Sequence, residues 1–131
     1  MSGSSETPVY VPGACNIGTE EVAARRRAAL AAAGATLVLG GLLVASGAPR
    51  ESRFLVGVPA AMAAVSWLQV RNSFCVAYAA RGVYNVAQPL GMASPVADAA
   101  ARGADRRRAL RMIAGGVAVG VLVAAGLFLV P

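Results

Sequence analysis

The sequence predicts an all-α membrane protein of three transmembrane helices. Hydrophobic residues make up 57% of the 131-residue chain and charged residues only 14%, a balance that points to lipid rather than water as the solvent. Three long apolar runs account for most of this hydrophobicity, and all twelve basic residues are arginines that flank the runs. We therefore expect one membrane domain over residues 19–131, preceded by a polar and flexible cytoplasmic segment at residues 1–18.

The three spans are predicted at residues 28–48, 54–72 and 110–130. The first contains 21 residues without a charge, about the number that an α-helix needs to cross a hydrocarbon core of roughly 30 Å. The second begins with 17 uncharged residues and carries Pro59 near its start, where neighbouring helices can satisfy the freed carbonyl. The third is uncharged from Met112 to its end.

The arginines are distributed unevenly between the two sides of these spans. Ten lie in the N-terminal flank and in or beside the loop predicted at residues 73–109, whereas only Arg50 and Arg53 lie in the other connection. Because cytoplasmic segments carry the excess of basic residues, we expect a multi-pass protein of the cell inner (plasma) membrane. Its N-terminus would be cytoplasmic and its C-terminus outside.

Acidic residues are expected in the first turns of two helices, where they favour the positive end of the helix dipole. Thr19 precedes Glu20 and Glu21 and is predicted to be the N-cap of the first helix. Asp105 directly precedes the sequence RRRAL and is predicted to cap the third helix or to lie in its first turn. Each of these residues is assigned a structural role.

Small residues four positions apart indicate where helices can approach closely, since packing in lipid depends on close contact and not on a hydrophobic drive. Two such pairs occur: Gly41 with Ala45 in the first span, and Gly116 with Gly120 in the third. The pattern does not distinguish contacts within one chain from contacts between copies, so a homo-oligomer stays open.

The residue content argues against several classes of function. The first span, and the third span from Met112 onward, contain no Asp, Glu, Lys, Arg or His, which disfavours a proton relay, a carboxylate ion site or a gating charge. The chain has no histidine at all, so none can serve as a general base or a metal ligand. Aromatic and glycine-rich readout motifs are missing, which argues against a nucleic-acid partner. We predict no catalytic residue, no metal site and no enzymatic activity, and the sequence identifies no cofactor.

One polar segment interrupts the apolar chain: RNSFCVAYAARGVYN, beginning at Arg71. Wound as a single helix, it gathers aromatic and polar side chains on one face. This face suits contact with lipid headgroups or with a partner, since tyrosine and arginine favour the bilayer interface; its members are Phe74, Tyr78, Arg81 and Asn85. Cys75 lies on an adjacent, slender face. The segment is therefore predicted to be an interfacial amphipathic extension of the second span.

The two cysteines allow two interpretations. Cys75 can be a small packing residue, because free cysteine is often buried. Alternatively, Cys15 and Cys75 can form a thiol pair at the cytoplasmic face, where a reducing environment would make them a redox switch, a persulfide carrier or a metal site shared across a dimer. Their spacing of sixty positions matches no zinc or redox motif.

An Asn-Ile-Gly element at Asn16, an arginine cluster, an apolar hairpin and then Phe-Cys-x-x-Tyr at Phe74 follow one another in the chain. Over about residues 15–85 this order resembles the YgaP-like transmembrane family. The resemblance implies a small bacterial inner-membrane helical hairpin that can dimerise, and it hints at sulfur chemistry because some members are joined to a rhodanese domain. This sequence departs from the family by its cysteine before Asn16, its RGVYN continuation, its third span and its lack of a rhodanese domain.

The leading functional hypothesis is a non-enzymatic accessory or scaffold subunit of a larger membrane complex, acting through helix packing. Its partners would be membrane lipids and either other membrane subunits or further copies of itself. The alternative is a membrane protein that handles thiols or sulfur at the cytoplasmic face through Cys15 and Cys75. A small oligomeric pore is a third hypothesis, but the residues that would line it are sparse: Thr36, Ser46, Ser66 and Gln69.

Overall fold

The computed structural model describes residues 9–86 and 92–131. The elements follow in the order α1 (Thr19–Ala45), a 3-10 helix η2 (Arg50–Val56), α2 (Gly57–Asn72), α3 (Val76–Arg81), β1 (Val83–Tyr84), β2 (Ser94–Pro95) and α4 (Ala99–Leu129). Three helical stretches, namely α1, η2 with α2, and α4, are long and apolar enough to cross a membrane. The predicted all-α fold is therefore confirmed, and β1 and β2 form only a short antiparallel pair.

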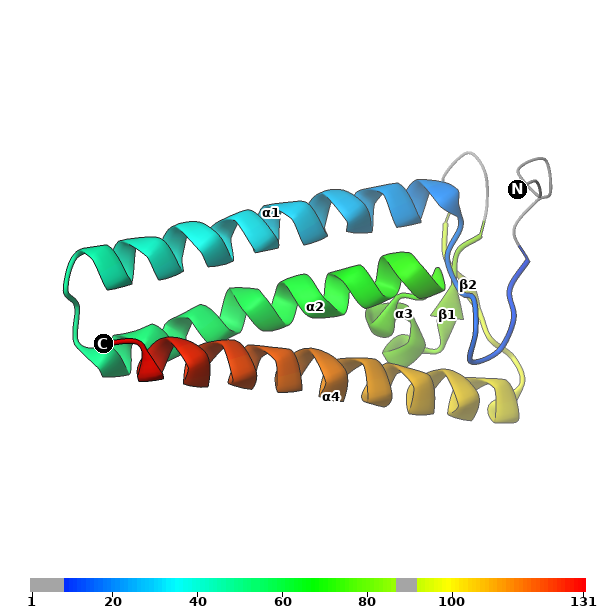
Figure 1. Ribbon diagram of the computed structural model, residues 1–131. Helices are drawn as coiled ribbons and strands as arrows, with labels where there is room; N and C mark the ends of the chain where they lie inside the picture. Colours follow the sequence, from blue (N-terminus) through cyan, green and yellow to red (C-terminus); the bar gives the residue numbers. More distant parts are fainter. Residues whose placement is uncertain (1–8, 87–91) are drawn as a thin grey trace.

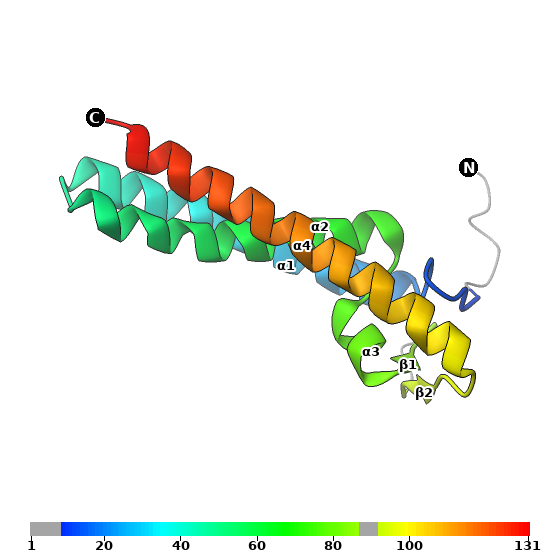
Figure 2. The same ribbon diagram turned by 90° about the horizontal axis from the view of Figure 1, so that it is seen from below.

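The helix α2 lies between α1 and α4 and runs in the opposite direction to both (Figure 1). The start of α1, the end of α2 and the start of α4 therefore meet at one end of the molecule, together with α3 and the two strands (Figure 1, Figure 2). We call this end the polar end, because ten of the twelve arginines lie in or beside its elements. The C-terminus lies at the opposite end (Figure 1).

Glycines bring α2 and α4 into close contact. A Cβ atom at Gly120 would lie 2.5 Å from the carbonyl oxygen of Gly57, and one at Gly57 would lie 2.9 Å from the carbonyl oxygen of Gly120. One turn earlier in α4, any side chain at Gly116 would overlap Val65. Gly116 and Gly120 thus lie at a contact within one chain, where small residues let two helix backbones meet.

The other small pair lies on an open surface. Gly41 and Ala45 are both exposed on α1, and no atom of the described residues lies within 4 Å of a Cβ built at Gly41. The contact of α1 with the rest of the bundle instead uses Gly40, whose Cβ would lie 3.6 Å from side chains of Val56 and Leu127. Gly41 and Ala45 therefore make no helix contact within the described part of this chain.

The helix α4 begins eleven residues before the predicted third span, inside the region expected to be a loop at residues 73–109. Asp98 is its N-cap, and the carboxylate accepts a hydrogen bond of 3.3 Å from the N–H of Ala100. The alanine-rich sequence that follows has high helix propensity. Asp105 is consequently neither a cap nor a first-turn residue, and its predicted role was wrong: it is fully buried within α4.

The predicted continuous helix through residues 71–86 was also wrong. The helix α2 ends at Asn72, Ser73 adopts a left-handed conformation with φ of 49°, and Cys75 is extended. This turn lets Phe74 enter a core cluster with Ala79 and Met112, where it is fully buried. Phe74 is therefore a core residue and not an interfacial one, because insertion removes its ring from both lipid and water.

The described residues of the segment before α1 are residues 9–18, and their last three pack against the bundle. Asn16, Ile17 and Gly18 are buried, and Gly18, rather than Thr19, occupies the N-cap position of α1. The flexibility expected for residues 1–18 stays a prediction, and residues 1–8 lie outside the described chain. We call residues 9–18 the strap.

Candidate functional site

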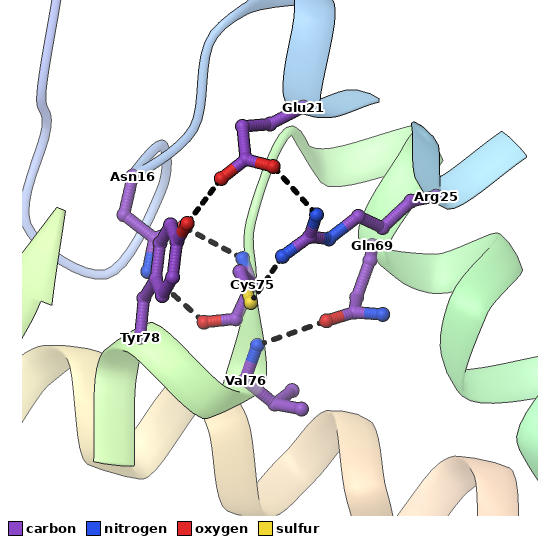
Figure 3. Close-up of polar contacts among 7 residues, drawn as sticks. All are labelled: Asn16, Glu21, Arg25, Gln69, Cys75, Val76 and Tyr78. Carbon is purple, nitrogen blue, oxygen red and sulfur yellow. Dashed lines mark hydrogen bonds and ion pairs between the residues drawn. The ribbon is translucent and has the colours of Figure 1, made fainter. Parts of the chain in front are cut away.

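The strap meets the turn between α2 and α3 through Asn16. The Asn16 side chain donates a 3.1 Å hydrogen bond from Nδ2 to the carbonyl of Cys75 and accepts one of 2.6 Å at Oδ1 from the N–H of Cys75 (Figure 3). The backbone of Asn16 is also bonded on both sides: its N–H donates to the carbonyl of Ser73, and its carbonyl accepts from the N–H of Asn85. Asn16 is fully buried. Through its side chain and its backbone, Asn16 therefore ties the strap to the turn between α2 and α3 and to the residue after β1.

The thiol of Cys75 faces a charged side chain of α1. Cys75 is 2% exposed, and Arg25 Nη2 donates a 3.0 Å hydrogen bond to its sulfur. The other nitrogen, Nη1, forms an ion pair of 2.7 Å with Glu21, one turn earlier on α1. The second oxygen of Glu21 accepts a hydrogen bond from the Tyr78 hydroxyl (Figure 3). A chain of polar contacts thus runs from the thiol through Arg25 and Glu21 to Tyr78.

The turn that presents Cys75 is stabilised from the inside by Gln69. Its side-chain oxygen accepts a 3.0 Å hydrogen bond from the N–H of Val76, the first residue of α3 (Figure 3). An N–H at a helix start has no intrahelical partner, so a side-chain acceptor there replaces a cap. Gln69 therefore belongs to the group of polar contacts around Cys75, which we call the junction; its members are Asn16, Glu21, Arg25, Gln69, Cys75 and Tyr78. Because Gln69 is buried, it lines no pore in the described chain.

The environment of Tyr78 favours its neutral form. The hydrogen bond to Glu21 is the largest cause and raises the pKa of the Tyr78 hydroxyl above its ordinary value of 10.0, and burial and the Glu21 charge act in the same direction. The nearby charge of Arg25 acts in the opposite direction. The guanidinium groups of Arg25 and Arg81 lie 5.6 and 5.4 Å from the ring centroid, within cation–π range.

The four residues predicted to share an interfacial face are separated by the structure. Arg81 is exposed and Tyr78 is half-buried, so these two do lie at the surface of the polar end. Asn85 is buried beyond the end of α3 and its carbonyl accepts from the N–H of Gly18 at 3.0 Å. The helix break at Gly82, with φ of 72°, places Asn85 against the strap and not on a common face with Phe74.

The two cysteines lie at the polar end but bond to different groups. Both are free thiols. Cys15 is adjacent to Asn16 in the strap, and its sulfur lies 3.6 Å from the carbonyl oxygen of Ile17. Burial raises the pKa of the Cys15 thiol. Arg25 thus contacts Cys75, while Cys15 contacts only backbone among its described hydrogen bonds.

A second buried group holds the strap at α4. Asp105 accepts hydrogen bonds of 2.7 Å from the Tyr10 hydroxyl and 2.7 Å from the N–H of Gly13. The ring of Tyr10 stacks on Tyr84, with centroids 4.5 Å apart. Burial and the bond to Asp105 raise the pKa of the Tyr10 hydroxyl. The strap is therefore held at two points: Asn16 bonds to the turn between α2 and α3, and Tyr10 bonds to α4.

Sequence reasoning missed Asn16, Glu21 and Arg25 as members of the junction, and Asp105 as a second buried polar group. One signal was available: Asp105 lies on the regular buried face of α4, at helical spacing between other buried residues, namely Ala101, Ala109, Met112, Gly116, Gly120 and Ala124. Cys75, to which both Asn16 and Arg25 bond, lies 59 positions from Asn16 and 50 positions from Arg25. No local pattern carries that information.

The arrangement places the guanidinium of Arg25 directly against the sulfur of Cys75. Across residues 9–86 and 92–131, no three His, Cys, Asp or Glu side chains come together to hold a metal ion. Comparisons of the chain with models of protein families, with curated proteins and with solved structures gave no match.

Proposed function

We propose that the protein is a non-enzymatic accessory or scaffold subunit of a larger membrane complex and acts through helix packing. The observation that carries this proposal is the small fraction of α1 that its own chain covers. Only Glu21, Ala29 and Gly40 of this 27-residue helix are buried. The exposed remainder includes Gly41 and Ala45, and small residues at this spacing favour close approach of another helix. A partner helix on α1 would complete its packing.

The proposed location is the bacterial inner membrane, with the polar end in the cytoplasm. Support comes from the ten arginines that lie in or beside the elements of that end, against Arg50 and Arg53 near the other, since basic residues are retained on the cytoplasmic side. A reporter fused after Pro131 tests this orientation. Activity of a periplasm-dependent reporter agrees with it, and activity of a cytoplasm-dependent reporter contradicts it.

Native mass spectrometry of the protein purified from its own membrane tests the accessory role. We expect stoichiometric foreign subunits, and we expect Gly41→Leu to remove them because a large side chain would fill the small-residue surface. Val121→Leu, at an exposed position of α4, is the matched control and should retain them. Recovery of the wild-type protein without foreign subunits would overturn the proposal.

A second proposal, favoured by the 3.0 Å contact between Arg25 and the Cys75 sulfur, is thiol or sulfur handling at the cytoplasmic face. In this reaction the Cys75 thiolate would attack the outer sulfur of a persulfide donor. A new sulfur–sulfur bond forms on Cys75, the bond within the donor breaks, and the donor leaves as a thiolate. Cys75 is 2% exposed, so the strap must open for the donor to enter.

Incubation with a small persulfide donor and intact-mass measurement test this second proposal. Wild-type protein should gain a sulfur atom on Cys75, Cys75→Ser should lack that gain, and Cys15→Ser should retain it. An Arg25→Gln variant should react more slowly because the thiolate loses its neighbouring charge. Equal labelling of wild type and Cys75→Ser would refute it.

A relation to the YgaP-like family remains a proposal. The two elements that carry the resemblance, Asn-Ile-Gly and Phe-Cys-x-x-Tyr, contact each other through Asn16 and Cys75, which gives a physical reason for both to occur in one chain. A structure of a family member that lacks the same amide-to-backbone contact would count against the relation.

A further inference from the structure

A groove lies between α3 and α4 at the polar end. It has a volume of about 250 Å³ and its lining is apolar except for one arginine; the lining residues are Val76, Ala80, Arg106, Ala109, Leu110 and Ile113. Leu110 is 66% exposed and Ile113 is 41% exposed. Because residues four and seven positions after Arg106 fall on the same helix face, a guanidinium lies directly above two open apolar side chains.

The position of this groove is that of a membrane interface. The uncharged part of α4 begins at Met112, so Ile113 belongs to the apolar part of the span and Arg106 to the charged part. Hydrocarbon would face the lower part of the groove and headgroups its rim. Arg106 is exposed and makes no hydrogen bond or ion pair with another described residue, so its charge is available to a ligand.

The charges around the groove favour an anion. Two acids of the polar end are engaged inside the protein: Glu21 bonds Arg25 and Tyr78, and Asp105 bonds the strap. Glu20 and Asp98 are the acids of this end that the described chain exposes. The arginines, in contrast, point outward. Those that the described chain exposes at this end are Arg26, Arg27, Arg71, Arg81, Arg106, Arg107 and Arg111. Exposed arginines therefore outnumber exposed acids at this end, and the surface around the groove is positively charged.

We infer that this groove binds one anionic phospholipid, with the phosphate on Arg106 and the upper part of an acyl chain on Ala80, Leu110 and Ile113. The lining matches both halves of the ligand. A free phosphate would leave the apolar floor open to water, and the ammonium group of a zwitterionic lipid would bring a further positive charge to an arginine-rich rim. The surrounding arginines add attraction that any anionic headgroup shares. The site does not depend on the proposed partner subunit.

Titration of the purified full-length chain with phosphatidylglycerol and phosphatidylcholine of identical acyl chains tests this inference, with bound lipid counted by native mass spectrometry. We expect preferential retention of phosphatidylglycerol. Arg106→Gln should weaken that binding about fivefold, the effect of one basic residue near an anionic surface, and should weaken phosphatidylcholine binding less. Arg106→Lys keeps the charge and should retain most of the binding.

The control variant is Arg50→Gln, which removes an exposed arginine at the opposite end and should bind phosphatidylglycerol as the wild type does. Ala80→Leu fills the groove without changing the charge and should also weaken binding. Equal retention of the two lipids, or equal effects of Arg106→Gln and Arg50→Gln, would overturn the inference. Displacement of phosphatidylglycerol by millimolar inorganic phosphate would do the same, because it would mark a site for a free anion.

Discussion

The side chain of Asn16 pairs with both backbone groups of Cys75, a residue 59 positions away. An amide side chain can accept one hydrogen bond and donate another at the same time. It can therefore take the place of a neighbouring β-strand, which would otherwise bond the N–H and the carbonyl of an extended residue. Cys75 is extended between two helices and is buried, where unpaired backbone groups are costly. One side chain thus makes the sharp reversal from α2 to α3 possible.

Asn16→Ala should destabilise the protein by about 2 kcal/mol or more, since it leaves a buried donor and a buried acceptor without partners. Equilibrium unfolding in mixed micelles measures the effect. Thr36→Ala is the control: the Thr36 hydroxyl bonds only to the carbonyl of Ala32, one turn earlier, and its loss should cost little. Similar losses for the two variants would contradict the assigned role of Asn16.

Gly120→Ala should destabilise the bundle by about 1–3 kcal/mol, because the added methyl group would overlap the carbonyl of Gly57. At Gly126 a Cβ would meet open space, so Gly126→Ala should be neutral or stabilising by up to about 1 kcal/mol, the gain in helix propensity. The same unfolding measurement compares the two. A neutral result at Gly120 would mean that α2 and α4 do not approach as closely as described.

The stability should fall at alkaline pH through the tyrosine hydroxyls. Tyr78 and Tyr10 each donate to a carboxylate, and the pKa of each is raised above its ordinary value of 10.0. A group whose folded pKa is raised contributes stability that is fully present below the unfolded pKa and is lost as the pH rises towards the folded pKa. The Tm should therefore decline above about pH 10.

Replacement of the two hydroxyls tests that explanation. The double variant Tyr10→Phe with Tyr78→Phe should have a lower Tm at neutral pH and a flatter Tm profile between about pH 8 and pH 11. Profiles with the same slope for variant and wild type would assign the alkaline loss to other groups.

The two thiols should differ in their reaction with iodoacetamide. Cys15 is partly exposed and Cys75 is buried, so Cys15 should be alkylated first, at a rate that rises with pH because burial raises its pKa. Asn16→Ala should accelerate the alkylation of Cys75 by loosening the strap. Peptide mass analysis over time distinguishes the sites, and alkylation of Cys75 before Cys15 in the wild type would be inconsistent with this packing.

Arg53 should secure the last turn of α4. Its Nη1 donates hydrogen bonds of 2.9 Å to the carbonyl of Leu127 and 2.6 Å to that of Val130, and carbonyls at a helix end have no intrahelical partners. Arg53→Gln should increase hydrogen exchange over the last turn of α4, with a loss of about 1–3 kcal/mol in stability. Arg50→Gln, at an exposed position, should not.

The sequence predicted the spans because uninterrupted hydrophobicity is a local property and each run could be measured on its own. It did not predict the helix break at Ser73, because the local helix propensities allow α2 to continue through Phe74. The break is favoured by burial of Phe74 in the core, which depends on residues far away in the sequence. Asp105 was misassigned for a related reason. An acid before three arginines resembles a cap, and its actual partners, Tyr10 and Gly13, lie more than 90 positions away.

The helix α4 continues without interruption from its membrane-spanning part into the polar end. Its 31 residues give a length of about 46 Å, whereas the hydrocarbon core is roughly 30 Å thick. About a third of the helix would therefore extend beyond the hydrocarbon, and the strap is hydrogen-bonded to that part at Asp105. If a change in bilayer thickness alters the tilt of α4, we expect the bond between Asp105 and Tyr10 to move the strap with it.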